Sequence, residues 1–291
     1  MNERATGAGP SLENRLPAEG INSSDEHPLR EFAWLIGASL VTLAVVIVLV
    51  GWGARWLAPR LPFEAEVALA QRVVDKPVEP ATFEQARRSA TLQALAERVA
   101  ATMGLPPGMA PVATYVDSPV VNAYATLGGR IRVFKGLLDK LESEDALAAL
   151  LAHEIAHVKH RHVAANLGRG MALSLLLGLV SADAGAMAAQ GALGTATGLA
   201  LLGYSREQET QADEEALAAV VAVYGHARGV VELFESLRRA SPGTDTGLEV
   251  LGSHPLTATR IDAVRERARH AAWPMTGELT PLPTALASRT R

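Results

Sequence analysis

The sequence predicts a predominantly helical α+β fold with a small β-hairpin or sheet, plus one N-terminal transmembrane helix. An uncharged run over residues 32–54 is long enough to cross a bilayer. Downstream segments repeat apolar residues at helical spacing, whereas residues 112–134 have the short alternating pattern of strands. With 291 residues and no cysteine, the chain can bury a core but cannot form disulfides or thiolate metal sites.

The apolar run has the length and flanks of a membrane anchor. At about 1.5 Å per residue it spans roughly 34 Å, and a hydrocarbon core is about 30 Å thick. Trp34, Trp52 and Trp56 lie at its ends, where aromatic rings prefer the headgroup level. The polar tail before it is too long and too acidic for a signal peptide. We therefore predict a disordered tail over 1–31 and an anchor in the lipid bilayer over 32–57.

Basic residues near the anchor indicate its orientation only weakly. The N-terminal side offers Arg30, and the C-terminal side offers Arg55, Arg60, Arg72 and Lys76. The positive-inside bias places the large C-terminal part in the cytoplasm, with a bacterial inner membrane as the expected location. The difference in charge is small, and a long folded domain can cross regardless, so the side stays open.

The rest of the chain divides at proline-rich boundaries. We predict a juxtamembrane linker over 58–81, a folded domain over 82–272 and a loose tail over 273–291. In the domain, apolar spacing and capping residues predict helices and strands. The expected helices are 82–103, 143–162, 206–224, 228–240 and 257–272, and the expected strands are 112–115, 120–125 and 130–134, with a turn at Gly128-Gly129.

The expected helix from Ser143 contains the motif His153-Glu154-Ile155-Ala156-His157. Residues four apart share a helical face, so both imidazoles can reach one metal ion while Glu154 projects near the same point. This arrangement is typical of zinc peptidases, in which the carboxylate takes a proton from the attacking water. Because the chain has no cysteine, a third ligand must be a carboxylate or another imidazole.

A second pair of residues supplies candidates. Glu209 and Asp213 are four apart, so Glu209 could bind the metal while Asp213 hydrogen-bonds a ligand imidazole. The alternative is a solvated acidic face, because more glutamates lie nearby. The histidine motif favours the metal-binding role.

These motifs, in this order, resemble those of the M48 metallopeptidases. The resemblance covers roughly residues 82–272 and is specific, although Leu127 stands where the family often has proline. Besides the histidine motif, it rests on Asn122–Ala125 with Gly128-Gly129, Ile131-x-Val133-x-x-Gly136-Leu137-Leu138, Ser205-Arg206 with Glu209-x-x-Ala212-Asp213, and Ser253-His254-Pro255 with Arg260-Ile261.

The resemblance implies a zincin/gluzincin-like peptidase domain with one zinc ion per chain, as in single-anchor bacterial quality-control members of the family. It implies His153, His157 and Glu209 as ligands. Glu154 would be the general base, and His254 with Arg260 would stabilise the oxyanion.

Two further features near the motifs have roles that the sequence leaves open. The expected strand that contains Asn122–Ala125 could bind an extended substrate by strand addition, or it could be an ordinary sheet edge. Its residues are Asn122, Ala123, Tyr124 and Ala125. We expect His160 and His162 to be solvated, because they fall off the face of the motif. We expect His27, His226 and His270 at the surface.

A shared metal ion constrains the second apolar region, 171–204. His157 and Glu209 must lie on one side of the membrane, so the chain between them crosses it an even number of times. The run over 171–182 is too short to span, and we therefore predict no crossing. The segment would form close-packed helices or a lid, and contact with the membrane surface stays possible.

The sequence thus predicts a membrane-anchored, zinc-dependent metalloendopeptidase in protein quality control, acting on unfolded or misfolded polypeptide. The alternative is a membrane-tethered holdase or assembly factor with a latent or weakly active zinc site. A prenyl-protein processing enzyme is disfavoured because one span cannot build a multi-helix chamber. The net charge of −4 argues against a nucleic-acid partner, and the oligomeric state is not indicated.

Overall fold

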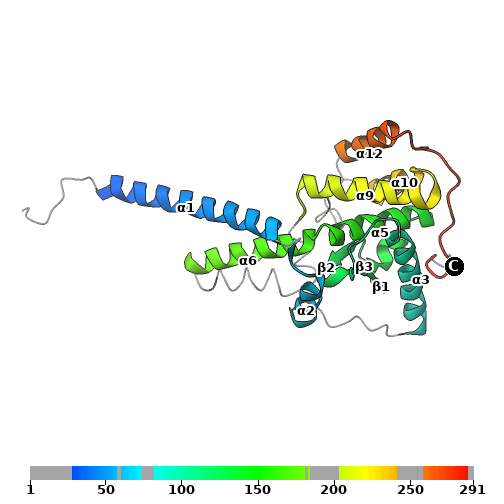
Figure 1. The fold of residues 1–291 in the computed structure, drawn as a ribbon, viewed down its shortest axis with the longest axis horizontal. Coiled ribbons are helices and arrows are strands. Elements are labelled where there is room, and N and C mark those ends of the chain that lie inside the picture. Colours follow the sequence, from blue (N-terminus) through cyan, green and yellow to red (C-terminus); the bar gives the residue numbers. More distant parts are fainter. Residues whose placement is uncertain are drawn as a thin grey trace, which may run out of the picture. The chain divides into compact units, whose positions relative to one another are not determined.

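The computed structural model describes residues 28–57, 60–73, 82–180, 183, 203–240, 254 and 258–287. They form a mostly helical fold with one three-stranded sheet (Figure 1), which confirms the predicted α+β class. The chain divides into two compact units, residues 1–45 and 46–291.

Helix α1 (Pro28–Leu57) is long and apolar. Among the described residues it alone has a stretch, Leu29–Gly53, that is long and apolar enough to cross a membrane. Large apolar side chains such as Trp34, Leu35 and Val41 are exposed along it. These properties fit the predicted single-pass anchor. The predicted tail up to residue 27 lies outside the described residues.

The sheet has the order β1-β3-β2. Strands β2 (Ala123–Thr126) and β3 (Arg130–Phe134) form the predicted hairpin, and β1 (Val112–Val116) pairs with β3 in parallel. The turn η2 (Leu127–Gly129) joins the hairpin, and both its glycines have positive φ angles, near 75°, that suit glycine. Because β3 lies between the other two strands, β2 is an edge strand of the sheet.

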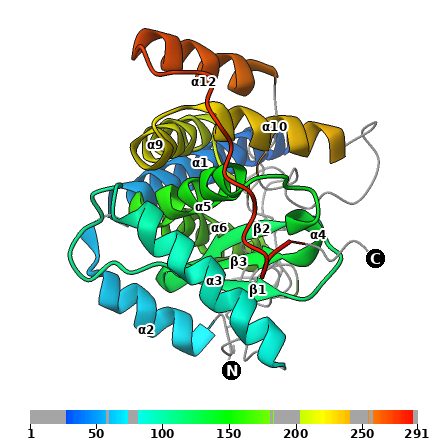
Figure 2. The same ribbon diagram turned by 90° about the vertical axis from the view of Figure 1, so that its right-hand side faces the viewer.

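Two helices flank the sheet region (Figure 2). Helix α3 (Phe83–Ala100) packs against β1, and α2 (Phe63–Val73) packs against η2. The backbone N–H of Gly128 donates a hydrogen bond to Glu66 Oε1 on α2. The short helix α4 (Lys135–Leu138) follows β3. These contacts hold β2 at a fixed position beside the next helix.

Helix α5 (Glu144–Lys159) is the centre of the core, and every residue from Asp145 to Val158 is buried. Its N-cap is Ser143, whose hydroxyl oxygen accepts a hydrogen bond from the Ala146 N–H, as predicted. The expected helix 143–162 ends early, however, at Lys159. Arg161 has φ of 59°, which breaks the helix, and its guanidinium pairs with Glu66 at 2.8 Å.

A second helix, α6 (His162–Val180), starts directly after this break. The structure describes the second apolar region only in part: residues 171–180 belong to α6, and residues 181–182 and 184–202 lie outside the described residues. The absence of a membrane crossing in that region therefore stays a prediction.

Three further helices agree with the sequence analysis. They are α9 (Arg206–Tyr224), α10 (Arg228–Ala240) and α12 (Ala258–His270). Ser205 and Gln208 form a capping box at the start of α9, and Gly225, with φ of 79°, ends the helix. Helices α9 and α10 both pack along α5, and α12 packs on α9.

Residues 273–287 correct the expected loose tail. The Glu144 N–H donates to Thr280 O at 2.8 Å, and the Thr280 N–H donates to Asp145 Oδ2 at 2.9 Å. Leu286 is buried in the core. The segment docks because the first turn of α5 has N–H groups without partners inside the helix. The same segment buries His226, which we expected at the surface, and its Nε2 hydrogen-bonds to Glu278 O.

Close packing of α10 on α5 requires glycine at position 229. A Cβ there would lie 2.6 Å from the Asp145 Cβ and 2.7 Å from its carbonyl carbon. We expect Gly229→Ala to lower the free energy of unfolding by about 1–3 kcal/mol, because the two helices must move apart. Denaturant titration of the full chain in detergent measures this, with the exposed Arg238→Ala as the control. Equal stability of the two variants would contradict the packing argument.

Candidate active site

Helices α5 and α9 bring three predicted metal ligands together. His153 and His157 lie one turn apart on α5, and their Nε2 atoms are 3.2 Å apart. Glu209 reaches them from the first turn of α9, with Oε1 3.5 Å from His157 Nε2 and Oε2 3.6 Å from His153 Nε2. All three side chains are buried.

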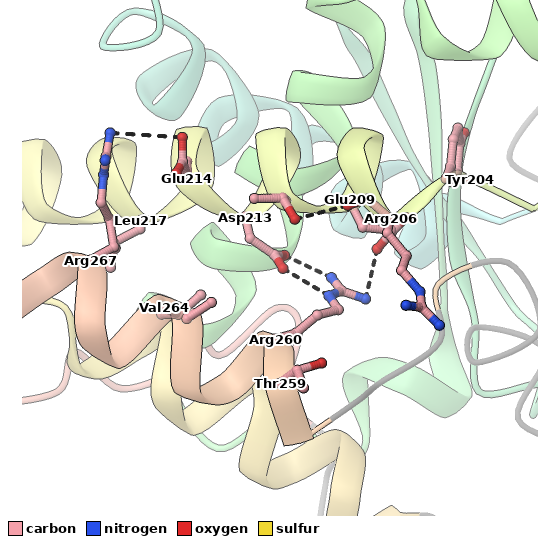
Figure 3. A pocket seen from close by; sticks show the side chains of 12 residues that line it. Tyr204, Arg206, Glu209, Asp213, Glu214, Leu217, Thr259, Arg260, Val264 and Arg267 are labelled. Atoms are coloured by element: carbon pink, nitrogen blue, oxygen red, sulfur yellow. Dashed lines mark hydrogen bonds and ion pairs between the residues drawn. The ribbon is translucent and has the colours of Figure 1, made fainter.

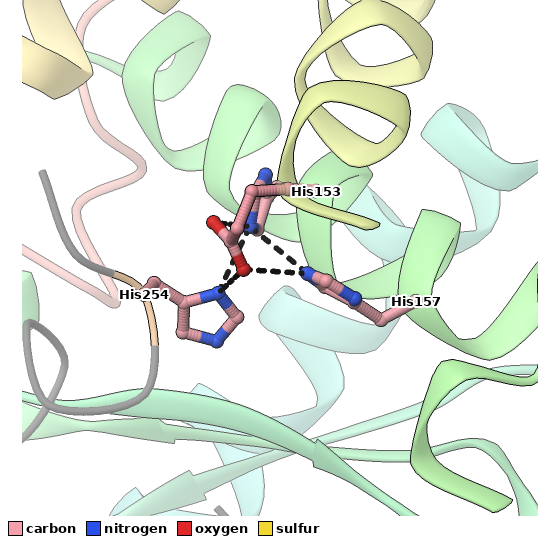
Figure 4. Close-up of side chains that lie close together, drawn as sticks. His153, His157 and His254 are labelled. Carbon is pink, nitrogen blue, oxygen red and sulfur yellow. Dashed lines mark hydrogen bonds and ion pairs between the residues drawn. The ribbon is translucent and has the colours of Figure 1, made fainter. Parts of the chain in front are cut away.

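His254 joins this group from outside both helices. Figure 4 shows its imidazole pointing toward His153 and His157. Its Nδ1 lies 2.8 Å from Glu209 Oε1 and 3.1 Å from His153 Nε2. The four potential ligand atoms all lie within 4.8 Å of one another. His254 therefore stands where a fourth ligand or an attacking water would bind.

The spacing of these atoms fits a metal ion. Nitrogen and oxygen ligands lie about 2.0–2.2 Å from zinc, so neighbouring ligands of a tetrahedral site are roughly 3.3–3.6 Å apart. The separations in the structure, 3.1–3.6 Å for the pairs that involve His153, fall close to this range. Two imidazoles and a carboxylate are also ligands that zinc prefers. The cluster could thus hold one metal ion.

Asp213 and Arg260 orient two members of the cluster (Figure 3). Asp213 Oδ1 lies 3.1 Å from His153 Nδ1. Arg260, on α12, donates to both oxygens of Asp213 at 2.8 and 2.7 Å, and its Nη1 lies 2.7 Å from Glu209 Oε2. The structure thus places Asp213 where the sequence analysis expected it. Arg260 points its donors at the two carboxylates.

The pKa values of both carboxyls reflect these contacts. Burial alone would raise the pKa of Glu209 and of Asp213. Hydrogen bonds and nearby positive charge outweigh it: His254 is the main partner of Glu209, and Arg260 is the main partner of Asp213. The result is a pKa below the ordinary value for both groups. Each carboxylate is therefore ionised and able to bind a cation.

Glu154 lies between the cluster and strand β2. Its Oε2 accepts a hydrogen bond from the Ala125 N–H at 2.8 Å, and its Oε1 lies 3.7 Å from His254 Nε2. Burial raises the pKa of its carboxyl. A carboxylate with a raised pKa is suited to taking up and releasing a proton.

The predicted substrate strand lies at this position. Ala123, Tyr124 and Ala125 belong to β2, and Asn122 precedes it. All four residues are buried, and the Ala125 N–H is already bound to Glu154. The strand is next to the candidate catalytic base, and binding of a substrate strand here stays a prediction.

Two residues at the site were missed by the sequence analysis. His162 is buried, not solvated as expected, and its Nδ1 lies 2.9 Å from His157 Nδ1. The reason is the break at Arg161, which helical periodicity does not reveal. Tyr204 stacks on the His157 ring at a centroid distance of 3.8 Å. No sequence signal marks Tyr204 beyond its place just before the α9 N-cap.

Burial and neighbouring imidazoles lower the pKa values of two histidines, His157 and His162. The pKa of His157 lies well below its ordinary value because the ring is buried beside His153 and His254. Burial, together with His160, lowers the pKa of His162 to about 4. Both rings are therefore neutral at neutral pH, and a neutral imidazole is the form that can bind a metal.

A cavity of about 690 Å³ lies between α9 and α12 beside the cluster (Figure 3). Tyr204, Glu209 and Arg260 are among the residues that line it. The carboxylate of the cluster can therefore be approached from this side.

Comparison with known proteins identifies the family. The family model of peptidase family M48 matches residues 86–268. A putative beta-barrel assembly-enhancing protease of Vibrio cholerae is 32% identical over 160 residues, which cover 51% of this chain and 33% of the relative. The mitochondrial metalloendopeptidase OMA1 of Schizosaccharomyces pombe is 30% identical over 172 residues, with 55% and 51% covered.

The metalloprotease YcaL of Escherichia coli is 29% identical over 150 residues, which cover 50% of this chain and 58% of that protein. The chain thus spans between 33% and 58% of the length of these three relatives. The family model matches more than half of the chain, and His153, His157, Glu209 and His254 meet in one buried cluster. The protein therefore belongs to peptidase family M48.

Proposed function

We propose that this protein is a membrane-anchored, zinc-dependent metalloendopeptidase. The observation that supports it best is the meeting of His153, His157 and Glu209 in one buried cluster, with Glu154 beside it. Membership of a peptidase family agrees with this chemistry. Helix α1 has the length and composition to hold the enzyme at a lipid bilayer.

The reaction would be hydrolysis of a peptide bond. Bound zinc would supply Lewis acidity to the scissile carbonyl and lower the pKa of the attacking water. Glu154 takes the proton from that water and then passes it to the leaving amine. Its buried position raises the pKa of the carboxyl, which favours both transfers. The Ala125 N–H holds the carboxylate in place through Oε2.

His254 and Arg260 have different positions relative to the reacting centre. His254 Nε2 faces Glu154, so this imidazole could stabilise a developing oxyanion once its Nδ1 leaves the cluster. The donors of Arg260 point at Glu209 and Asp213. We assign Arg260 to positioning of these carboxylates in preference to the oxyanion role that the family resemblance implies.

The proposed substrate is an unfolded or misfolded polypeptide. Two of the relatives are named as a beta-barrel assembly-enhancing protease and a mitochondrial metalloendopeptidase, and both names describe activity on proteins. A substrate in extended conformation could lie along β2, where Glu154 contacts the edge strand. Recognition of backbone rather than sequence suits a quality-control enzyme.

A second candidate function is a holdase or assembly factor with a latent zinc site. The position of His254 favours it, because Nδ1 stands where the attacking water would bind. Cleavage of casein by the wild type and by His254→Ala distinguishes the two. Faster cleavage by the variant assigns latency to His254, whereas slower cleavage assigns the imidazole to the reaction.

Glu154→Gln tests the proposed mechanism. We expect it to retain zinc but to lose casein cleavage by roughly 10²–10⁴-fold, because the amide cannot accept the proton. Zinc is measured by elemental analysis and cleavage by release of soluble peptides, with and without a chelator. Glu142→Gln is the matched control, because Glu142 forms an exposed ion pair with Arg239 far from the cluster. Full activity of Glu154→Gln would refute the mechanism.

Glu209→Gln tests the proposed ligand set. We expect zinc affinity to fall by more than the about 10–100-fold typical of outer-shell changes, because the variant loses a charged ligand. Affinity is measured by competition with a chromophoric chelator. Glu207→Gln on the exposed side of the same helix is the control. Equal affinities of the two variants would place the third ligand elsewhere.

Reporter fusions test the orientation of the anchor. We expect a C-terminal green fluorescent protein to be fluorescent and a C-terminal alkaline phosphatase to be inactive, because the positive-inside bias leans toward a cytoplasmic domain. Fusions at the N-terminus should report the opposite side, because we predict that α1 is the single span between the two ends. An active C-terminal phosphatase would place the catalytic domain in the periplasm.

A further inference from the structure

We propose that His162 is a positioning residue for the metal ligand His157 and acts through a hydrogen-bond chain that ends at Glu215. This inference rests on the proposed zinc site. It assigns a role to residues that the proposed mechanism does not use.

The first link lies inside the protein. His157 Nδ1 and His162 Nδ1 are 2.9 Å apart, and both rings are buried. His157 presents Nε2 to the cluster, so that nitrogen must carry its lone pair and Nδ1 must carry the proton. Nδ1 of His157 therefore donates, and Nδ1 of His162 accepts. This bond selects the tautomer of His157 that can bind a metal.

The next links follow from the first. A neutral His162 that accepts at Nδ1 has its proton on Nε2, which lies 3.1 Å from Gln211 Oε1 and donates to it. The Gln211 amide nitrogen donates to His160 Nδ1 at 3.0 Å. His160 Nε2 is then the donor to Glu215 Oε1 at 3.0 Å. In all four hydrogen bonds the donor is the residue nearer to the metal cluster along the chain of bonds.

A carboxylate terminates the chain. Lys159 Nζ lies 2.8 Å from both oxygens of Glu215 and holds them in place. Glu215 is ionised, because hydrogen bonds from Lys159 and His160 outweigh its partial burial and lower its pKa. His157 is thus connected to a carboxylate through three intervening side chains. His153 has the same kind of support directly, from Asp213.

The break after α5 makes the first link possible. In an uninterrupted helix, a residue five positions after His157 would point about 140° away from it around the axis. Arg161 has positive φ and pairs with Glu66, so the chain turns at this point. His162 comes to lie against His157 as a result. The break is therefore part of the arrangement that orients the ligand.

The hydrogen-bond chain also predicts how strongly a substitution at each of its residues should weaken metal binding. His162 is buried, whereas Gln211 is exposed. Water can replace a hydrogen bond at the surface but not in the buried interior. Effects on the metal should consequently be largest at His162 and should decrease toward Glu215. If these residues had only a structural role, their substitution would affect folding, and the effects on metal binding would not decrease from His162 to Glu215.

The test measures zinc dissociation constants of the full chain in detergent, by competition with a chromophoric chelator. The variants are His162→Leu, His162→Asn and Glu215→Gln, with Glu142→Gln as the control. We expect about 10–100-fold weaker binding for His162→Leu. His162→Asn should recover most of the affinity, because its amide oxygen can stand in for Nδ1. Glu215→Gln should have a smaller effect than His162→Leu.

The visible spectrum of the cobalt-substituted protein gives a second measurement. Its bands report the geometry of the metal site, so they should shift in His162→Leu and remain in place in Glu142→Gln. If the wild type binds zinc and His162→Leu binds it equally with an unchanged cobalt spectrum, the inference is wrong. If the wild type binds no zinc, the proposed function fails and the inference fails with it. Should His162→Leu not fold, His162→Asn decides: if it binds zinc about 10–100-fold more weakly than the wild type, although its amide oxygen can accept the hydrogen bond, the positioning role is overturned.

Discussion

The packing of α5 against α9 is the contact on which the candidate site depends. Both helices bury faces rich in alanine: Ala149, Ala152, Ala156, Ala212, Ala216 and Ala219. Helices with small side chains at their contact can approach closely. Imidazoles on one helix therefore reach a carboxylate on the other, although the two are far apart in the sequence. The composition of the chain, with 4% aromatic residues, suits this close packing.

Close packing of α5 and α9 also buries charged carboxylates. The ion pairs and hydrogen bonds around these carboxylates offset the free-energy cost of burying them. An ionised carboxylate in the interior is costly unless it is paired and hydrogen-bonded. Arg260 binds both Asp213 and Glu209, and Asp213 in turn binds His153. The same contacts that make burial tolerable also fix the directions of the side chains. Stability and orientation of the cluster therefore have one physical origin.

Local patterns in the sequence predict much of this arrangement. Spacing of four residues places His153 with His157, and Glu209 with Asp213, on single helical faces, and Ser143 caps its helix as expected. What the patterns miss depends on backbone breaks or on distant contacts. The positive φ of Arg161 brings His162 to the site, and docking of residues 273–287 on the start of α5 buries His226. Neither the backbone break nor the docking of this segment produces a periodic pattern in the sequence.

The geometry of the cluster also constrains the path of the chain. Because His157 and Glu209 lie 3.5 Å apart, the two residues are on the same side of any membrane. The chain between them must therefore cross a bilayer an even number of times, whatever its conformation. Two crossings would require residues 171–182 to span, and an α-helix of this length reaches only about 18 Å. This constraint on His157 and Glu209 is the physical basis of the prediction that the region between them adds no further anchor.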